Sequence, residues 1–319
     1  MRRRPLRTKP HASRRSLGSI NDETDDAAGA PAHLPVLFDE ALEALEIQPG
    51  GVYVDATYGA GGHTRGIVAR GGTVVAFDRD PAARLADDVR DHVTLIRRDF
   101  AELGGALDEL GLATVDGALF DLGVSSMQFD EAERGFSLLR DGPLDMRMNP
   151  TGGPTAYDLL ARSSESELAD LIFANGEERS ARRIARSIVA ARTGGRLPER
   201  TLELARLVAG VVHRSGTRER VHPATRTFQA LRIAVNDELA SLEGGLAGAA
   251  GRLRPGARIA AISFHSLEDR IVKHRFRDDE RLRVITRKPL LPSDAELARN
   301  PRSRSAKLRV AERLSIVRP

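Results

Sequence analysis

Hydrophobic and polar residues along this chain form two kinds of pattern, short apolar runs and longer stretches with helical spacing. The short runs, bounded by turn residues, predict strands. Helical patterns precede the first run, at Phe38–Leu45, and follow it, at Thr64–Arg70. Strands that alternate with helices predict an α/β fold with a mostly parallel, doubly wound, Rossmann-like sheet. The predicted strands are Val52–Asp55, Thr73–Phe77, Val93–Ile96, Gly117–Phe120, Arg258–Phe264, Leu282–Thr286 and Lys307–Val310.

The pattern changes after Asp130, where strand signals stop and amphipathic helices follow one another. Ser164 and Glu167 have the spacing of a capping box at the start of a helix. The next pattern, 177–191, places apolar residues on one face and arginines mostly on the other. That basic face suits contact with phosphates, and a solvated face explains it equally well. A third amphipathic helix is expected at 201–213.

Strand and helix signals alternate again beyond this block. Apolar residues from Phe228 to Leu246 recur every three or four positions, which predicts one long helix facing the sheet. We therefore predict an all-helical domain at 130–221, inserted into an α/β domain that is formed by residues 33–129 and 222–319.

Residues 1–32 hold a basic run, then an acidic run, and few apolar residues. Such a segment cannot bury a core, so we predict a disordered tail. It lacks the apolar centre of a secretory signal, and its acidic run argues against an organellar transit peptide. A tail that touches RNA nonspecifically and a tail that is only solvated are both open alternatives.

Composition narrows the possible chemistry. The 319-residue chain is 41% hydrophobic, which is enough for a substantial core, and its formal net charge is +4. Cysteine is absent, which excludes disulfides, cysteine-ligated zinc, iron–sulfur clusters and a cysteine nucleophile. No apolar run approaches about 18 residues, so no membrane span is expected.

The turn after the first predicted strand carries the main functional signal. Asp55 is followed by a glycine-rich turn with Gly61 and Gly62, and then by helix-compatible residues, an order typical of nucleotide-cofactor sites. The glycine spacing differs from the dinucleotide pattern, so a nucleoside-type ligand is favoured over a pyrophosphate. Asp78 ends the second strand about 20 residues beyond the turn, where such folds bind ribose hydroxyls.

Acidic residues follow four successive predicted strands: Asp55, Asp78, Asp99 and Asp121. Parallel strands bring their carboxyl ends to one edge of the sheet, and ligands bind at that edge. Solvation of a loop explains one acid in such a place. Four in succession indicate a site.

Eight segments are informative when they are taken together and in order. They are 33–37 (HLPVL), 55–63 (DATYGAGGH), 121–126 (DLGVSS), 133–137 (ERGFS), 142–148 (GPLDMRM), 222–230 (HPATRTFQA), 262–270 (ISFHSLEDR) and 300–305 (NPRSRS). In this order they resemble the family of bacterial small-subunit ribosomal RNA cytosine-N4 methyltransferases. The resemblance spans residues 34–313 and is highly specific, because eight segments stand in register.

The resemblance implies a class I S-adenosylmethionine-dependent methyltransferase with an inserted helical substrate-binding domain. Residues 1–31 have no counterpart in the family pattern, and 276–294 is short for the family, which leaves substrate contacts there unassigned. The implied cofactor residues are, for the glycine turn, Gly61, Gly62 and His63; for the ribose hydroxyls, Asp78; beside the adenine, Phe100; and near the methionine end, Asp121 and Gln128.

Methylation of a cytosine amine requires the nitrogen lone pair to point at the sulfonium methyl group. This lone pair is delocalised into the ring, so an oxygen that accepts an amine hydrogen would make the nitrogen more reactive. We hypothesise that Asp121 is this acceptor and that the turn through Ser125 and Ser126 shapes the base pocket; these three are the candidate catalytic residues. An equal alternative is that Asp121 only holds the amino group of the cofactor.

Other polar residues near these motifs have simpler explanations. His63 is assigned to a cofactor or structural contact rather than to proton transfer, and His265 to a supporting hydrogen bond. Arg134, Arg147 and Arg226 either hold RNA phosphates or pair with neighbouring acids. No cluster of His, Asp and Glu has metal-ligand spacing, so no metal is predicted.

These expectations combine into one functional prediction. It is N4-methylation of a cytosine in the decoding region of 16S rRNA, with S-adenosylmethionine as cofactor. The resemblance alone implies that the substrate is the small ribosomal subunit in the bacterial cytoplasm. The enzyme is expected to be a monomer or homodimer without a membrane partner. Two alternatives are open: a methyltransferase acting on another substrate, and a non-catalytic RNA-binding assembly factor that retains a cofactor pocket.

Overall fold

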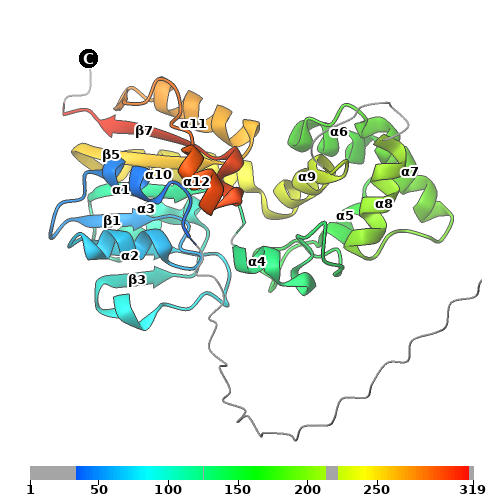
Figure 1. The fold of residues 1–319 in the computed structure, drawn as a ribbon, viewed down its shortest axis with the longest axis horizontal. Coiled ribbons are helices and arrows are strands. Elements are labelled where there is room, and N and C mark those ends of the chain that lie inside the picture. Colours follow the sequence, from blue (N-terminus) through cyan, green and yellow to red (C-terminus); the bar gives the residue numbers. More distant parts are fainter. Residues whose placement is uncertain (1–33, 125, 213–221, 316–319) are drawn as a thin grey trace, which may run out of the picture. The chain divides into compact units, whose positions relative to one another are not determined.

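The computed structural model describes residues 34–124, 126–212 and 222–315 (Figure 1). The predicted disordered tail, residues 1–32, lies outside the described residues. So do Ser125 and the last residue of the predicted helix 201–213. Within the described residues, no helix has the length and apolar character needed to cross a membrane.

One seven-stranded sheet organises the α/β part, with strand order β3-β2-β1-β4-β5-β7-β6. β7 is antiparallel to both of its neighbours, and all other pairs are parallel. The strands are β1 Val52–Asp55, β2 Thr73–Phe77, β3 Val93–Ile96, β4 Val115–Asp121, β5 Leu253–Ser263, β6 Leu282–Val284 and β7 Lys307–Arg313. This order with one reversed strand confirms the predicted class I fold.

The predicted strands all exist, and four differ at their ends; β7, for example, continues to Arg313, beyond its predicted end at Val310. β4 and β5 begin earlier than predicted, and their pairing shifts between Val115 and Gly117. The first residues of β5 after Leu253 are exposed and include Pro255 and Gly256, which break an apolar pattern. β6 ends at Val284, two residues earlier than predicted.

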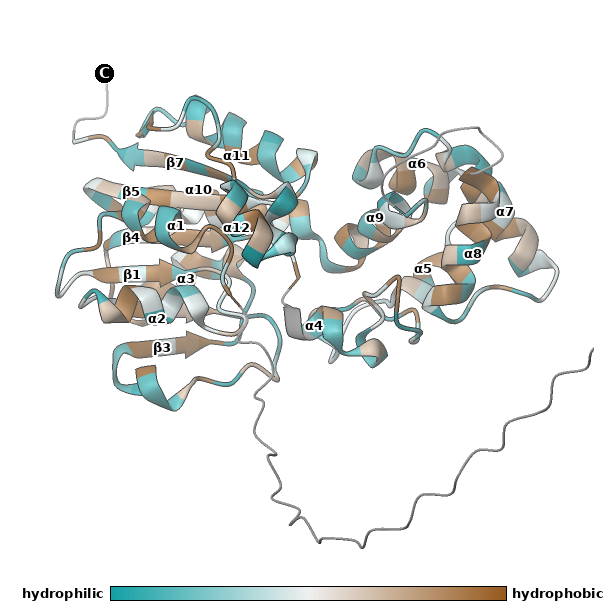
Figure 2. Ribbon diagram, viewed as in Figure 1, coloured by the Kyte–Doolittle hydropathy of each residue, from teal (hydrophilic) through white to brown (hydrophobic). Residues whose placement is uncertain are grey.

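Helices cover both faces of the sheet because alternate strand residues point to opposite sides. Tyr53 packs in a core with α1 Phe38–Leu45 and α2 Gly62–Ala69, whereas Val54 packs in a second core on the other face. Figure 2 shows the strands coloured mainly as hydrophobic. The helices that contribute to the second core are α3 Leu103–Glu109, α10 Glu238–Arg252 and α11 Ser266–Asp278.

A third core holds the helical block together. It contains Leu160, Ile172, Ile184, Leu204 and Phe228, all buried. The predicted capping box at Ser164 and Glu167 is present at the start of α6. The helices are α4 Ser126–Asp130, α5 Ala156–Arg162, α6 Glu165–Gly176, α7 Ala181–Thr193, α8 Thr201–Val212 and α9 Thr225–Asn236.

Two helix predictions in this region need correction. α7 begins at Ala181 rather than at 177, because Glu177 ends α6 in a left-handed conformation with φ of 49°. The single long helix predicted from Phe228 to Leu246 is wrong. Asp237, with φ of 50°, separates α9 from α10.

The break at Asp237 lets one continuous apolar pattern serve two cores. Phe228 and Leu231 of α9 pack in the helical block, whereas Leu242 and Leu246 of α10 pack against the sheet. Asp tolerates the left-handed conformation better than most residues, and periodicity alone does not reveal such a break. The domain boundaries at 130 and 221 stay a prediction.

Shorter elements complete the connections. α12 Asp294–Arg299 precedes the last strand. The 3₁₀ turns are η1 Asp87–His92, η2 Phe100–Glu102, η3 Ala132–Arg134 and η5 Pro301–Ser305. Two of these turns matter for the site, since η2 carries Phe100 and η3 carries Arg134.

Candidate functional site

The turn between β1 and α2 is fixed by the carboxylate that ends β1. Asp55 is 1% exposed. Its Oδ1 accepts the Thr57 N–H at 3.1 Å, and its Oδ2 accepts the Thr64 hydroxyl at 2.6 Å. Burial raises the pKa of Asp55, and these hydrogen bonds partly oppose the shift. Because Thr57 and Thr64 lie on either side of the glycines, Asp55 holds the turn in shape.

Glycine is required in this turn for two different reasons. Gly61 has φ of +74°, a conformation that residues with a side chain rarely adopt. Gly62 has no such backbone angle, but a Cβ there would lie 2.3 Å from Cγ of Pro35. Close packing on Pro35 is therefore a structural reason for Gly62. Contact of Gly61 and Gly62 with the cofactor stays a prediction.

Asp78 connects the glycine turn to the loop after β2. Its Oδ2 accepts the Gly59 N–H at 3.1 Å, and its Oδ1 accepts the Asp80 N–H at 2.9 Å. Burial raises the pKa of Asp78 to about 6. The carboxylate is thus held by backbone donors at the edge of the sheet, in the position where a ribose-binding acid is predicted.

Asp121 ends β4, next to the turn. Its N–H donates to the Thr57 hydroxyl at 2.7 Å. Its Oδ1 is buried and has no hydrogen-bond partner among the described residues. Burial, then the charges of Asp55 and Glu268, raise the pKa of Asp121. A buried acceptor without a donor is costly, and a ligand that brings an N–H group would satisfy it.

His63, the second residue of α2, lies between Asp121 and the segment before α1. Its Nε2 is 3.2 Å from the Val36 carbonyl oxygen, which only accepts, so Nε2 carries the proton. Its Nδ1 is 3.5 Å from Oδ2 of Asp121, and its ring stacks on Phe38. Burial lowers the pKa of His63 to about 4. The side chain is therefore a neutral, enclosed neighbour of Asp121, and its cofactor contact stays a prediction.

Phe100 lies at the start of η2, which follows β3. Its ring meets Phe120 edge-to-face, with centroids 5.6 Å apart. A Cβ on Gly245 of α10 would lie 2.6 Å from this ring, so close packing on α10 fixes its position. The ring is only partly buried, which leaves surface for a ligand. Its predicted contact with adenine is not tested by this packing.

The remaining predicted residues lie on or before α4. Gln128 is buried and donates from Nε2 to Oδ2 of Asp80 at 3.2 Å, two residues beyond Asp78. Ser125 is outside the described residues, and so is the side chain of Ser126. Their predicted role in a base pocket therefore stays a prediction, as does cofactor contact by Gln128.

The four acids at the strand ends do not all remain available to a ligand. Asp99 accepts the Ser241 hydroxyl at 2.9 Å and the Ala101 N–H at 2.8 Å, and it pairs with Arg79 at 3.0 Å. Asp55 is occupied inside the turn, as described above. Asp99 and Asp55 therefore have structural roles, and the inference that all four acids form a ligand site was too broad. Asp78 and Asp121 are the candidates.

Two of the arginines considered for phosphate binding are ion-paired. Arg134 donates to Oδ2 of Asp80 at 2.7 Å, and Arg147 donates to Oδ2 of Asp145 at 2.7 Å. Arg226 donates to the Glu177 carbonyl at 3.5 Å. The sequence analysis did not identify Asp80, which links the loop after β2 to Gln128 and Arg134. The signal available was its position two residues after Asp78, an acid already assigned to the site.

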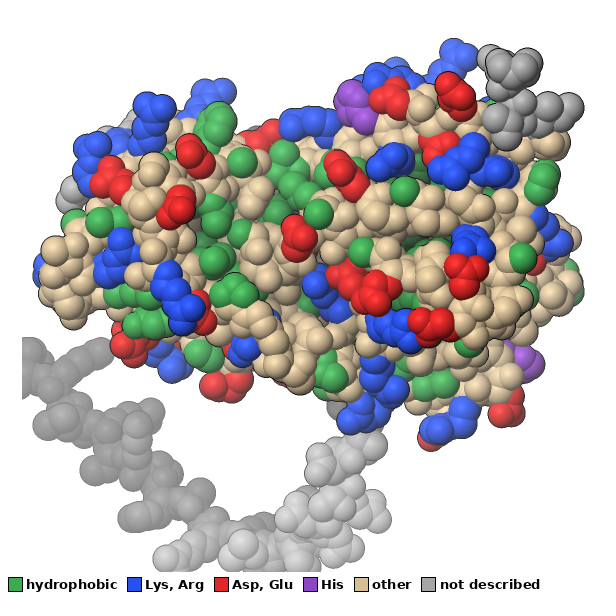
Figure 3. Space-filling view, turned by 180° about the vertical axis from the view of Figure 1, so that it is seen from behind, with side chains coloured by type: hydrophobic (Ala, Val, Ile, Leu, Met, Phe, Trp, Pro, Cys, Tyr) green, Lys and Arg blue, Asp and Glu red, His purple; other side chains and the backbone are tan. Residues whose placement is uncertain are grey.

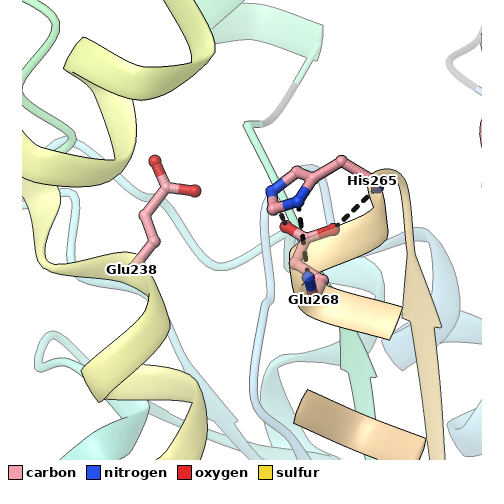
Figure 4. A group of neighbouring side chains, drawn as sticks. All are labelled: Glu238, His265 and Glu268. Carbon is pink, nitrogen blue, oxygen red and sulfur yellow. Dashed lines mark hydrogen bonds and ion pairs between the residues drawn. The ribbon is translucent and has the colours of Figure 1, made fainter. Parts of the chain in front are cut away.

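One cluster near the end of β5 has donor types that metals use. Ligand atoms of Glu238, His265 and Glu268 lie within 4.8 Å of one another (Figure 4). However, Arg232 donates to both oxygens of Glu238 at 2.8 Å, so a cation is already present. His265 uses Nδ1 to accept the Glu268 N–H as the cap of α11. We interpret the group as a hydrogen-bonded cluster that supports the end of β5.

Two cavities lie away from these strand ends. One, of about 670 Å³, is lined by charged side chains of α10, α11 and the loop before β6. The other, of about 340 Å³, is lined by residues that include Leu144 and Tyr157. Asp145, the partner of Arg147, lines the second cavity, but neither cavity is lined by Asp78, Phe100 or Asp121. We therefore define the candidate site by the side chains at the strand ends.

These side chains fit S-adenosylmethionine, the cofactor that the resemblance implies. The carboxylate of Asp78 offers oxygen lone pairs to ribose hydroxyls, and the partly exposed ring of Phe100 offers an apolar face to a purine. Oδ1 of Asp121 offers an unused acceptor to an amino group. The donors and acceptors present match those of an adenosyl amino acid.

Comparison with known proteins agrees with this fit. The model of the MraW methylase family matches residues 30–314. Ribosomal RNA small subunit methyltransferase H of Geobacter sulfurreducens is 51% identical over 311 residues, covering 89% of this chain and 99% of its own length. The protein of the same name from Synechococcus elongatus is 53% identical over 284 residues, covering 88% of this chain and 95% of its own length. The chain therefore belongs to the MraW methylase family and is a methyltransferase that uses S-adenosylmethionine.

Proposed function

We propose that this protein methylates the N4 amine of a cytosine in the decoding region of 16S rRNA, with the small ribosomal subunit as substrate in the bacterial cytoplasm. The names of its relatives support ribosomal RNA as the substrate. The observation that carries the choice of an amine is the buried Oδ1 of Asp121, which has no partner among the described residues. An N–H group of a bound amine would satisfy this oxygen.

The chain prepares the cofactor side of the reaction with groups that are fixed before the ligand arrives. Asp78 is held by two backbone N–H groups, and Asp55 holds the glycine turn. When bound, S-adenosylmethionine would supply the methyl group from its sulfonium sulfur and leave as the thioether S-adenosylhomocysteine. These hydrogen bonds place the binding groups before the ligand arrives, so part of the ordering that binding requires is already made.

Asp121 acts on the nucleophile. A cytosine amine is weakly nucleophilic because its lone pair is shared with the ring. When Oδ1 accepts one of its hydrogens, electron density moves toward nitrogen and the amine is oriented. Burial and the nearby Asp55 and Glu268 charges raise the proton affinity of Asp121, which makes it a stronger acceptor. As the N–C bond forms, one N–H bond breaks, and its proton goes to Asp121 or to water.

The helical block provides the contact with RNA in this proposal. A paired base must be turned out of its helix to reach Asp121. Arginines 179, 182, 183 and 186 are exposed on or just before α7 and suit phosphate contact. On the face seen in Figure 3, basic and acidic side chains are interspersed, so that face offers no broad basic area to RNA.

Transfer of a radiolabelled methyl group tests the proposal. Purified small subunits, ribosomal proteins alone and free nucleosides are each incubated with the enzyme and labelled S-adenosylmethionine. We expect label in the RNA of the subunits and none in the other two. Label in protein would support a different substrate, and absence of label despite cofactor binding would support a non-catalytic assembly factor.

A further inference from the structure

Asp80 is a buried acid two residues after Asp78, the proposed ribose acid. Its side chain is 10% exposed, and that of Arg134 is 16% exposed. Oδ2 of Asp80 accepts Nη1 of Arg134 at 2.7 Å and Nε2 of Gln128 at 3.2 Å. The N–H of Asp80 donates to Asp78. Burial acts to raise the pKa of Asp80, but the hydrogen bond from Arg134 and others lower it, so the carboxylate stays ionised.

The other side of the Arg134 guanidinium binds the helical block. Nη2 donates to the carbonyl oxygens of Arg147 and Met148 at 3.1 and 2.9 Å. The same segment is held from behind by Asn236, which accepts the Met148 N–H and donates to the Met146 carbonyl, both at 2.7 Å. Segment 146–148 is thus fixed between Arg134 and the end of α9.

A second arginine, Arg79, also connects the 78–80 loop to the end of α9. Arg79 lies between Asp78 and Asp80, and its Nη1 donates to the Asn236 carbonyl at 2.7 Å. Its Nη2 pairs with Asp99 at 3.0 Å. The loop 78–80 therefore contacts the helical block through two guanidinium groups, and neither group binds the cofactor in our proposal.

We infer that Arg134 is a positioning residue that couples occupancy of the ribose site to the placement of segment 146–148. Because Met146 and Met148 pack in the core of the helical block, which contacts RNA in the proposed function, this placement also affects RNA binding. The inference rests on the proposed role of Asp78. When ribose hydroxyls bind Asp78, the 78–80 loop loses freedom, and the planar fork of Arg134 transmits this restriction through three short hydrogen bonds. By linkage, RNA binding must strengthen cofactor binding by the same factor.

A purely structural role for Arg134 predicts a different result. Its loss would then lower the stability of the protein but leave the binding of cofactor and RNA independent. Arg134→Met removes the guanidinium group. Arg134→Lys keeps a positive charge beside Asp80, but its single ammonium group cannot also donate to the two carbonyl oxygens. Arg147→Met is the matched control, because it removes a comparable ion pair, to Asp145, in the same segment.

Hydrogen exchange with and without S-adenosylhomocysteine tests the coupling in the full chain. In the natural protein we expect slower exchange at 57–80, where the ligand binds, and also at 144–150. In Arg134→Lys and Arg134→Met the first effect should remain and the second should disappear. The Arg147→Met control should retain both effects.

Affinity for small subunits gives the second readout. We expect S-adenosylhomocysteine to tighten binding by about tenfold in the natural protein and not in Arg134→Lys. If Arg134→Met does not fold, comparison of the natural protein with Arg134→Lys still tests the coupling. Protection confined to 57–80 in the natural protein overturns the coupling alone. No protection at 57–80 overturns the ribose assignment as well, and with it the proposed function.

Discussion

At the scale of single residues, the two candidate carboxylates differ in what satisfies them. Asp78 already accepts two backbone N–H groups, whereas Oδ1 of Asp121 accepts nothing from the described residues. Both have raised pKa values, chiefly because each carboxyl group is partly withdrawn from solvent. The first is therefore suited to hold hydroxyl groups in a fixed place, and the second to accept a hydrogen from a reacting group.

Ligand binding should depend on pH through Asp78. Its pKa is about 6 in the ligand-free protein, and ribose hydroxyls donate to the ionised form. Binding therefore favours loss of the proton, so affinity is full above pH 6 and falls as pH drops below it, by up to about tenfold per unit. Calorimetric titration with S-adenosylhomocysteine from pH 5 to 8 measures this. In Asp78→Asn the affinity should be low and flat around pH 6; an unchanged slope there would assign the titration to another group.

Asp121→Asn separates the two roles proposed for that side chain. The amide keeps the size and one acceptor but loses the charge and proton affinity. If Asp121 acts on the substrate amine, kcat should fall by about 100-fold or more, while affinity for S-adenosylhomocysteine changes little. A large loss of affinity with unchanged kcat would assign Asp121 to the cofactor alone. Unaltered values of both would remove it from the site.

The sequence locates strand-end residues better than it locates their partners. Asp78 and Asp121 follow apolar runs, so their place at one edge of the sheet is predictable. The partner of Asp80 is not, because Arg134 is 54 residues away and the ion pair depends on how the helical block meets the 78–80 loop. Asp99 illustrates the same limit, since its role depends on Arg79 and Ser241.

At the scale of elements, two helices lie so close to neighbouring side chains that only glycine fits at the contact. Gly62 begins α2 directly against Pro35, and Gly245 of α10 lies against the ring of Phe100. A glycine-rich turn in a sequence suggests ligand contact. It does not show that Gly62 is also required because Pro35 packs against it. The break at Asp237 is a comparable case, because the apolar pattern continues through it while the helix does not.

Replacement of Gly62 tests the packing of α2. In Gly62→Ala the new Cβ would lie 2.3 Å from Cγ of Pro35, so Pro35 or the start of α2 must shift. We expect a loss of about 1–3 kcal/mol in the free energy of unfolding, measured by urea titration.

Gly104→Ala serves as the control for that measurement. Gly104 is in α3, and a Cβ there meets no atom within 4 Å. Alanine favours helix over glycine by about 1 kcal/mol, so this variant should be as stable as the natural protein or more stable. Equal stability of Gly62→Ala and Gly104→Ala would show that Pro35 yields without cost.

At the scale of the whole molecule, the sheet order and the helical block follow from patterns that the sequence displays. Strands alternate with helices until Asp130, and the apolar faces of the later helices form a separate core. How the helical block meets the sheet depends instead on buried polar contacts at Asp80, Arg79 and Asn236. Such contacts join residues far apart in sequence and leave no periodic signal.

The most direct test of the account identifies the methylated base itself. Small subunits from cells that lack this protein are incubated with it and with S-adenosylmethionine carrying a deuterated methyl group. Nucleosides from the 16S rRNA and its decoding-region fragment are then analysed by mass spectrometry. We predict deuterated N4-methylcytidine at one position in that fragment. Deuterium on carbon 5, on another nucleoside or only in protein would contradict it.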